Sequence, residues 1–169
     1  IGNVIAIKKG TGSIGLTVML DAHMDEVGLM VTGYNGDGML RVAAIGGVDD
    51  RILPGKRVLV GPKKLPGVIG AKPVHLLGED ERDSVVKIDA LRVDIGVGSK
   101  SAAGGRAPLG TRIAFDTRYI DLGTVVRGKA FDDRAGCAVL VHVLQGERLP
   151  FDLVAAFTVQ EEVGVRGAK

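Results

Sequence analysis

Three short acidic clusters carry the side chains that could do chemistry in this chain: residues 22–28 (AHMDEVG), 131–136 (FDDRAG) and 160–164 (QEEVG). Each cluster follows a run of apolar or β-branched residues, so we expect each to lie where a buried strand ends. His, Asp and Glu side chains that converge from separate strand ends are the usual ligands of a divalent metal ion. The sequence therefore predicts a metal site at one edge of an α/β sheet.

The first cluster places His23 two residues before Asp25. On an extended backbone, residues two apart project to the same side. His23 could offer a ring nitrogen to a metal while Asp25 orients the ring from behind. An ordinary hydrogen-bonded pair of His and Asp would explain the same spacing.

The second cluster contains the adjacent carboxylates of Asp132 and Asp133, between a predicted strand and a predicted helix. A carboxylate at this position can bridge two cations, and its neighbour can hold the loop. The alternative is a plain helix cap, because Asp is favoured at helix starts for its hydrogen bonds to the backbone.

The third cluster contains Glu161 and Glu162 directly after an apolar strand. Two adjacent carboxylates repel each other unless a cation or a proton separates them. One Glu would bind a metal and the other would take a proton from a water molecule. A solvated acidic turn is the alternative for this cluster alone, but the three clusters together favour ligands of Zn²⁺, Co²⁺ or Mn²⁺.

Four segments would position these clusters. Residues 4–7 resemble a strand, and the continuous apolar runs 16–20 and 151–159 predict strands buried on both faces. Residues 135–144 predict a buried helix, because the run is long and apolar and begins after two acidic residues.

The segment between these elements has a different character. Short β-like pieces alternate there with Gly and Pro turns, at 29–32, 40–44, 57–60, 68–70, 93–95 and 111–115. This spacing predicts a small all-β barrel or sandwich. We expect a short polar helix or turn at 79–87 and a loop at 99–108. The predicted organisation is an α/β domain, residues 1–28 and 120–169, interrupted by a β domain, residues 29–119.

The composition restricts the class of protein. The chain has 169 residues, of which 46% are hydrophobic and only 4% aromatic, and its net charge is +2. No basic block indicates a nucleic-acid surface, and no stretch approaches the roughly 18 apolar residues of a membrane span. The lone Cys137 cannot form an internal disulfide, so we expect a reducing, cytoplasmic setting.

Four strings in order connect the chain to a known family: residues 22–28, 66–73 (PGVIGAKP), 128–136 (GKAFDDRAG) and 158–164 (TVQEEVG). With these strings the chain resembles the cytoplasmic dinuclear metallo-aminopeptidases of the tetrahedral (TET) type. That family includes glutamyl aminopeptidases and proteins labelled endoglucanase M. The resemblance runs over essentially the whole chain.

The resemblance implies a role for each candidate residue. His23 would bind one of two divalent ions, Zn, Co or Mn. Asp132 would bridge both ions, with a cis peptide bond to Asp133, and Glu162 would bind the second ion. The catalytic residues would be Glu161, as general base, and Asp25, as the group that supports His23.

The resemblance also implies a fold, partners and a reaction. The α/β part would be a partial phosphorylase/hydrolase-like catalytic domain, and the insert would be a PDZ-like barrel used for dimerisation. Members assemble into dimers and twelve-subunit shells and release N-terminal amino acids from peptides. Peptide substrates and homo-oligomers are therefore the expected partners, with no nucleic acid and no membrane.

The chain departs from this pattern in its metal ligands. The family's site needs a further Asp and a further His, and residues 163–169 contain neither. The N-terminal helix of the family is absent too, so we expect an inactive fragment. Two other functions stay open: a glycoside hydrolase that uses Glu161 and Asp132 as its two carboxylates, and a non-catalytic dimerisation module.

Overall fold

The computed structural model describes residues 1–78 and 83–169, and the chain divides into two compact units. Unit 1 consists of residues 1–26 and 128–169, and unit 2 of residues 27–127. The functional division expected from the sequence, a catalytic part and a dimerisation insert, stays a prediction.

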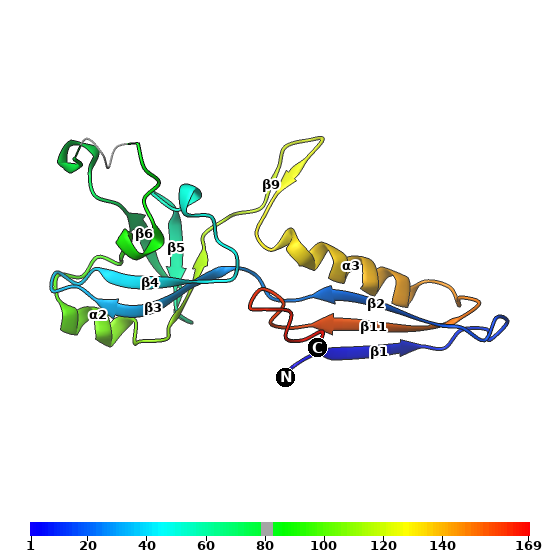
Figure 1. Ribbon diagram of the computed structural model, residues 1–169. Coiled ribbons are helices and arrows are strands. Elements are labelled where there is room, and N and C mark those ends of the chain that lie inside the picture. Colours follow the sequence, from blue (N-terminus) through cyan, green and yellow to red (C-terminus); the bar gives the residue numbers. More distant parts are fainter. Residues whose placement is uncertain (79–82) are drawn as a thin grey trace. The chain divides into compact units, whose positions relative to one another are not determined.

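Unit 1 contains a three-stranded sheet in the order β1-β11-β2, with helix α3 (Phe131–Gln145) running along it (Figure 1). Strand β11 (Asp152–Thr158) lies in the middle, parallel to β2 (Thr17–His23) and antiparallel to β1 (Val4–Lys8). The parallel register sets Thr158 opposite His23. The segments that follow β2 and β11 therefore leave the sheet at the same edge.

The core of unit 1 is small and lies between α3 and the sheet. Its buried members are Ala22 of β2, Leu140 of α3 and Ala155 of β11. The expected central strand is confirmed, because β11 lies between β1 and β2 and each of its residues is buried or half-buried.

The predictions that β2 is buried on both faces and that α3 is a buried helix are wrong. Met19 is 62% exposed and Leu20, on the opposite face of β2, is 38% exposed, so neither face of this strand is fully covered. Val139 and Val141 of α3 are also exposed, and Leu140 is the buried residue of this helix. In the described part of the chain, α3 therefore packs one of its faces against the sheet and exposes its opposite face to solvent.

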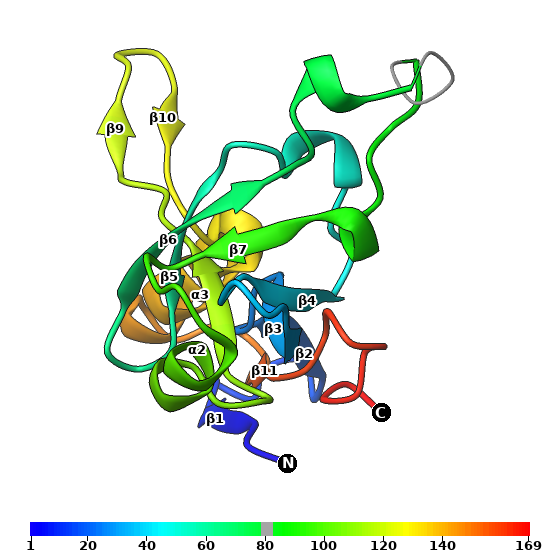
Figure 2. The same cartoon turned by 90° about the vertical axis from the view of Figure 1, so that its left-hand side faces the viewer.

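Unit 2 is built around a closed six-stranded barrel in the order β3-β4-β7-β6-β5-β8 (Figure 2). Its strands are β3 (Gly28–Tyr34), β4 (Leu40–Ile45), β5 (Arg57–Val60), β6 (Leu65–Gly70), β7 (Arg92–Asp94) and β8 (Arg112–Phe115). Each of the six predicted β pieces overlaps one of these strands, so the expected all-β barrel is confirmed. Closure of the barrel leaves no unpaired strand edge.

The barrel encloses a continuous apolar core. Leu40, Leu53, Leu91 and Val93 are completely buried in it. Short 3₁₀ helices connect the strands at Asp50–Ile52, Val74–Leu76 and Ile88–Ala90. Strands β9 (Ile120–Asp121) and β10 (Val126–Arg127) form a separate hairpin at the end of the unit.

One predicted loop is a helix. Residues 99–108 contain α2 (Lys100–Arg106), whose first turn is capped by the Ser99 hydroxyl accepting from the Ala102 N–H. Ala103 and Ala107 are completely buried against the barrel, and this burial explains the helix. Residues 79–82 of the expected polar helix or turn lie outside the described residues, and 83–87 form a turn and irregular backbone.

None of the helices in the described part of the chain combines the length and the apolarity that crossing a membrane requires.

Candidate metal centre

The end of β2 and the segment after β11 bring the first and third acidic clusters together. His23 is the last residue of β2, and Glu161 and Glu162 follow β11 within a few residues. The Met24 N–H donates to the Thr158 carbonyl at 2.8 Å, which continues the pairing of the two strands beyond the sheet. The two clusters are therefore fixed to each other by the backbone.

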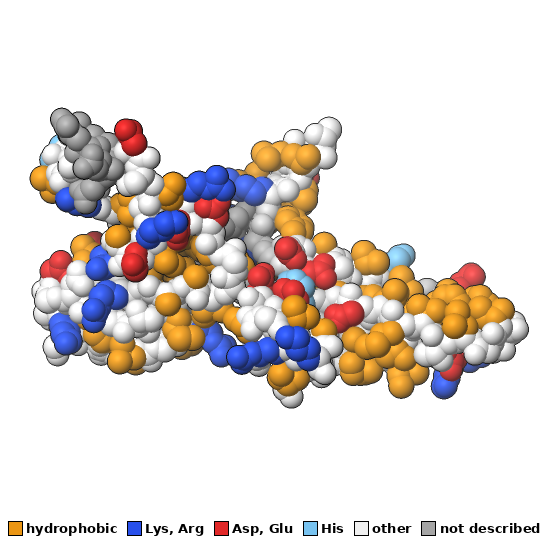
Figure 3. Space-filling view, viewed as in Figure 1, with side chains coloured by type: hydrophobic (Ala, Val, Ile, Leu, Met, Phe, Trp, Pro, Cys, Tyr) orange, Lys and Arg blue, Asp and Glu red, His pale blue; other side chains and the backbone are white. Residues whose placement is uncertain are grey.

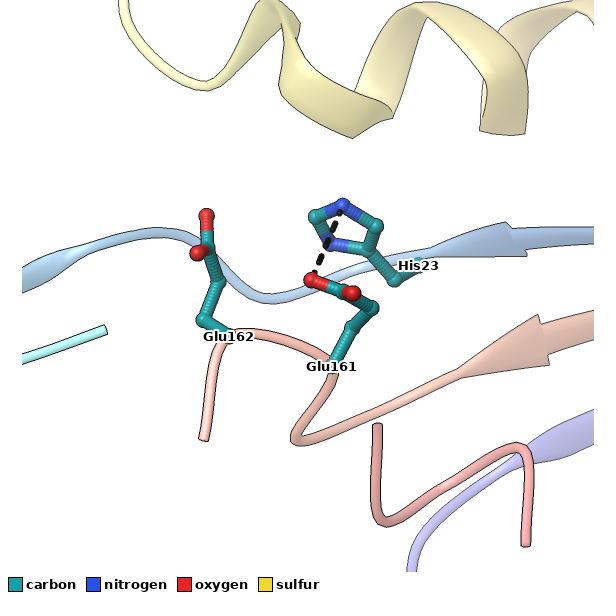
Figure 4. A group of neighbouring side chains, drawn as sticks. All are labelled: His23, Glu161 and Glu162. Atoms are coloured by element: carbon teal, nitrogen blue, oxygen red, sulfur yellow. Dashed lines mark ion pairs between the residues drawn. The ribbon is translucent and has the colours of Figure 1, made fainter. Parts of the chain in front are cut away.

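Three of the predicted site residues form a compact group. One ligand atom each from His23, Glu161 and Glu162 can be chosen so that all lie within 4.8 Å of one another. The side chains rise from the strand ends to the same side, toward α3 (Figure 4). Figure 3 shows acidic side chains gathered around a histidine on the face drawn. A divalent cation fits this donor set of one imidazole and two carboxylates.

Asp132 approaches the same group from the start of α3. Its Oδ1 lies 3.1 Å from His23 Nε2, and the Asp132 side chain is 89% exposed. The peptide bond between Asp132 and Asp133 is cis, as the resemblance implies. The alternative of a helix cap describes Asp133, whose Oδ1 accepts from the Gly136 N–H. Asp132 contacts His23 instead.

The ring of His23 has a defined orientation. Its Nδ1 lies 3.2 Å from the carbonyl oxygen of Asp25. The opposite ring nitrogen, Nε2, faces carboxylates, among them Asp132 Oδ1 at 3.1 Å. The Nε2 atom lies 3.7 Å from Oε2 of Glu161, and the His23 side chain is only 11% exposed. Nε2 is therefore the atom available to a metal ion.

The carboxylate of Asp25 has partners that the sequence did not indicate. Its Oδ1 accepts from the Glu161 N–H at 3.0 Å, and its Oδ2 accepts from the Glu162 N–H at 3.2 Å. The carboxylate also lies 3.6 Å from His23 Nδ1, which is longer than the contact with the carbonyl. No sequence signal could have found these contacts, because they join segments 136 and 137 positions apart.

Three further residues hold the segment after β2 in place. The Cys137 thiol donates to the His23 carbonyl, and Arg134 Nε donates to the Met24 carbonyl at 3.2 Å. Lys129 forms an ion pair with Glu26. Sequence reasoning missed these roles, although all three residues lie in or next to the 128–136 string.

Charge repulsion and burial perturb two groups of the site. Burial lowers the pKa of His23, but the hydrogen bond to Asp132 and the nearby carboxylates outweigh it, so the pKa of His23 is raised. Burial raises the pKa of Glu162, and the neighbouring charge of Glu161 raises this pKa further. Negative charge from neighbouring carboxylates raises the pKa of His23 and adds to the effect of burial on the pKa of Glu162, and a bound cation would neutralise this charge.

Comparison with known families adds an independent observation. The sequence profile of the M42 glutamyl aminopeptidase family matches residues 2–169. The glutamyl aminopeptidase of Lactococcus lactis is 33% identical over 180 residues, which cover 100% of this chain and 50% of that protein. The chain spans about half the length of the curated relatives that it matches.

Solved structures give the same picture. A TET aminopeptidase of a marine sediment Thaumarchaeota archaeon superposes with a TM-score of 0.89 at 35% identity, over 99% of this chain and 49% of that chain. The TET1 peptidase of Pyrococcus horikoshii, which can assemble into a tetrahedron or a large octahedral shell, gives 0.84 at 37%, over 99% and 51%. An endoglucanase of Thermotoga maritima gives 0.76 at 40%, over 94% and 46%.

Proposed function

The chain belongs to the M42 glutamyl aminopeptidase family, and on this premise we propose that it forms part of a metal-dependent aminopeptidase. The intact protein would release N-terminal amino acids from peptides. The observation that carries this proposal is the convergence of His23, Glu161 and Glu162 at the ends of two parallel strands.

The donor set fits divalent cations. His23 would hold one ion through Nε2, Glu162 would hold a second, and Asp132 would bridge the two. Two divalent cations, Zn, Co or Mn, supply Lewis acidity that activates a water molecule and polarises a peptide carbonyl when they are bound. The ligands after Glu162 that the resemblance implies, an Asp and a His, are not among residues 163–169.

Glu161 would be the general base. Its Oε2 lies 3.7 Å from His23 Nε2, so its carboxylate would be adjacent to an ion held by that nitrogen. Glu161 would accept the proton of that water and later pass it to the leaving amine. Removal of a general base costs about 10²–10⁴-fold in rate.

The experiment uses the full-length protein and a set of amino-acid amides as substrates. Glu161→Gln should retain metal, measured by elemental analysis, and should lose at least about 10²-fold in kcat. Glu147→Gln, an exposed position after α3, is the matched control and should leave kcat unchanged. Normal turnover by the Glu161 variant would remove this residue from the role of base.

A glycoside hydrolase is the second candidate, because one similar structure is that of an endoglucanase. Sugar hydrolysis by two carboxylates needs no metal. Treatment of the full-length protein with a chelator separates the two functions. We expect the chelator to abolish peptide hydrolysis, with recovery on adding Zn²⁺ or Co²⁺, and we expect no cleavage of a β-glucan. Chelator-resistant β-glucan cleavage would overturn the aminopeptidase proposal.

For the chain of 169 residues alone, we propose weak metal binding and no turnover, because it supplies three of the five expected ligands. Calorimetric titration with Zn²⁺ or Co²⁺ measures this directly. Two tight sites in the chain alone would contradict the proposal. The lone Cys137 is consistent with a cytoplasmic location, which we also propose.

Unit 2 would be the PDZ-like dimerisation insert of a homo-oligomer. The TET1 peptidase of Pyrococcus horikoshii can assemble into a tetrahedron or a large octahedral shell. We propose that the protein that contains this chain likewise forms a homo-oligomer, a dimer or a dodecamer.

A further inference from the structure

We propose that Asp25 is a positioning residue for the two glutamates, and that its carboxylate fixes the segment that presents them. This inference rests on the proposed function for its purpose, since Glu161 and Glu162 are the proposed base and metal ligand. The family resemblance instead implies that Asp25 supports the ring of His23. In the structure the Asp25 carboxylate binds the backbone N–H groups of Glu161 and Glu162.

The two oxygens of the Asp25 carboxylate are divided between two backbone donors. Oδ1 accepts from the Glu161 N–H at 3.0 Å and Oδ2 from the Glu162 N–H at 3.2 Å, and both hydrogen bonds are partly buried. Hydrogen bonds to an ionised carboxylate are stronger than those between neutral groups. Because the carboxylate binds two successive N–H groups, one side chain orients the peptide planes of both Glu161 and Glu162.

The His23 ring is oriented by the main chain of Asp25 and does not need the Asp25 side chain. The nearest partner of His23 Nδ1 is the main-chain carbonyl of Asp25 at 3.2 Å, which any residue at position 25 would supply. The carboxylate oxygen lies 3.6 Å from the same nitrogen, beyond ordinary hydrogen-bond distance. The side chain of Asp25 therefore makes its specific contacts with the glutamates.

The segment after β11 has a conformation that needs such an attachment. Gln160 adopts a positive φ of 58°, which is unfavourable for a residue with a side chain. On its C-terminal side the turn is closed by its own backbone, with Val165 N–H donating to the Glu161 carbonyl and Arg166 N–H to the Gln160 carbonyl. On its N-terminal side the N–H groups of Glu161 and Glu162 are held by Asp25.

The position of Asp25 is also electrostatically unfavourable. A third carboxylate beside Glu161 and Glu162 adds repulsion between like charges. Two backbone N–H donors compensate for this repulsion at Asp25 itself. The arrangement places negative charge where a cation is expected, and it fixes the backbone that carries the two glutamate side chains.

The test measures amide hydrogen exchange and imidazole ¹⁵N shifts by NMR in the metal-free chain. In Asp25→Ala, we expect the amides of Glu161 and Glu162 to exchange at least tenfold faster. In the isosteric Asp25→Asn, one of the two amides should keep its protection, because the side-chain amide has a single acceptor oxygen. At a pH where the ring is neutral, the tautomer of His23 should be the same in both variants as in the unmodified chain.

Asp152→Asn is the matched control, because Asp152 Oδ1 accepts from the Gly10 N–H at 2.9 Å in the same unit. It should leave exchange at Glu161 and Glu162 unchanged. The amide of Ala155 in β11 reports whether each variant keeps its fold. Unchanged exchange at both glutamates, or a change of the His23 tautomer in a folded variant, would overturn the proposal.

A second measurement separates this inference from the proposed function. In the full-length protein, Asp25→Ala should weaken Zn²⁺ binding at least tenfold in calorimetry, and Asp25→Asn should weaken it less. If the unmodified protein binds no metal, the proposed function fails, while the exchange result still decides the role of Asp25. If Zn²⁺ affinity is unchanged in the Asp25→Ala variant, the positioning role is wrong.

Discussion

The acidic side chains around His23 differ in their neighbours, and the neighbours decide what each carboxylate can do. Asp132 is exposed and contacts the His23 ring, whereas Asp25 is occupied by two backbone donors. Glu161 and Glu162 carry like charge on adjacent residues at the edge of the sheet. The metal-free site is therefore electrostatically strained, and its stability should depend on pH.

Glu162 gives a prediction with a defined sign. Burial and the charge of Glu161 raise its pKa in the folded chain. A raised pKa means that Glu162 contributes stability below its unfolded pKa, near 4.5, and that this contribution is lost as the pH rises through the folded value. Glu162→Gln should therefore stabilise the metal-free chain at pH 8 and change its stability little at pH 4, measured by urea unfolding.

The control for this prediction is Glu147→Gln, at an exposed position of the same unit. It should show no comparable difference between pH 4 and pH 8. With saturating Zn²⁺ the sign at Glu162 should reverse, because the variant loses a proposed ligand while ligand binding stabilises the folded state. A Glu162 variant that is less stable than the original chain at pH 8 without metal would refute the electrostatic argument.

At the scale of residues, the sequence predicted which side chains would converge but not how they are held. His23, Glu161 and Glu162 follow from acidic clusters at strand ends, and their proximity needs only the rule that parallel strands end at one edge. The expectation that a buried strand precedes Asp132 is wrong, because the strand before it, β10, is exposed and pairs with β9 in a separate sheet. The contacts of Asp25 could not be predicted, because the register of β2 against β11 decides them. That register is a property of the folded sheet.

Helix α3 is the element that connects the fold of unit 1 to the site. Asp132 lies in its first turn, and Leu140 anchors it to the sheet by packing with Ala22 and Ala155. A core of so few buried residues gives each of them a large share of the stability of the unit. Asp132 is therefore positioned by a helix whose one buried side chain is Leu140, with Cys137 and Leu144 packed against the same core.

Leu140→Ala should destabilise unit 1 by about 2–4 kcal/mol, because it removes buried apolar volume that the small core cannot replace. Val139→Ala is the matched control, since Val139 is 59% exposed on the same helix, and it should change stability by less than about 0.5 kcal/mol. Chemical denaturation followed by circular dichroism measures both variants. Equal effects of the two substitutions would show that α3 is not anchored by Leu140.

The elements that the sequence predicted correctly are those with strong local signals. The six barrel strands follow from alternation of apolar residues with Gly and Pro turns. Helix α2 could not be predicted, because Gly104 and Gly105 lower its intrinsic helix propensity. Packing of Ala103 and Ala107 against the barrel overrides that propensity. The exposure of β2 was mispredicted because an apolar run does not reveal how many faces of a strand are covered.

At the scale of the whole molecule, the two units differ in how well each buries its own apolar residues. Among the described residues of unit 2, fourteen buried residues form one core: Leu29, Val31, Leu40, Val42, Leu53, Val58, Val60, Ile69, Leu91, Val93, Ile95, Ala103, Ala107 and Ile113. Unit 1 leaves Val4, Ile5, Ile7 and Met19 of its sheet exposed. Apolar area removed from water is the main source of stability.

Residues 27–127 should therefore fold on their own, with one cooperative thermal transition by calorimetry. Leu91→Ala in this segment should lower its stability by about 2–5 kcal/mol, because Leu91 is completely buried in the barrel. Leu109→Ala is the control, since Leu109 is 64% exposed. A segment without a cooperative transition would show that the barrel depends on unit 1 for its stability.

Self-association of the same segment tests the proposed dimerisation role of unit 2. The hairpin β9–β10 exposes several large apolar side chains close together in sequence, among them Leu122 and Val125, each 60% exposed. Contiguous exposed apolar residues are typical of protein interfaces. In analytical ultracentrifugation, residues 27–127 should sediment as a dimer, and Leu122→Lys should shift the population toward monomer because it would bury a charge in the contact. Leu109→Lys should leave the dimer intact, whereas a strictly monomeric segment at high concentration would exclude unit 2 as the dimerisation domain.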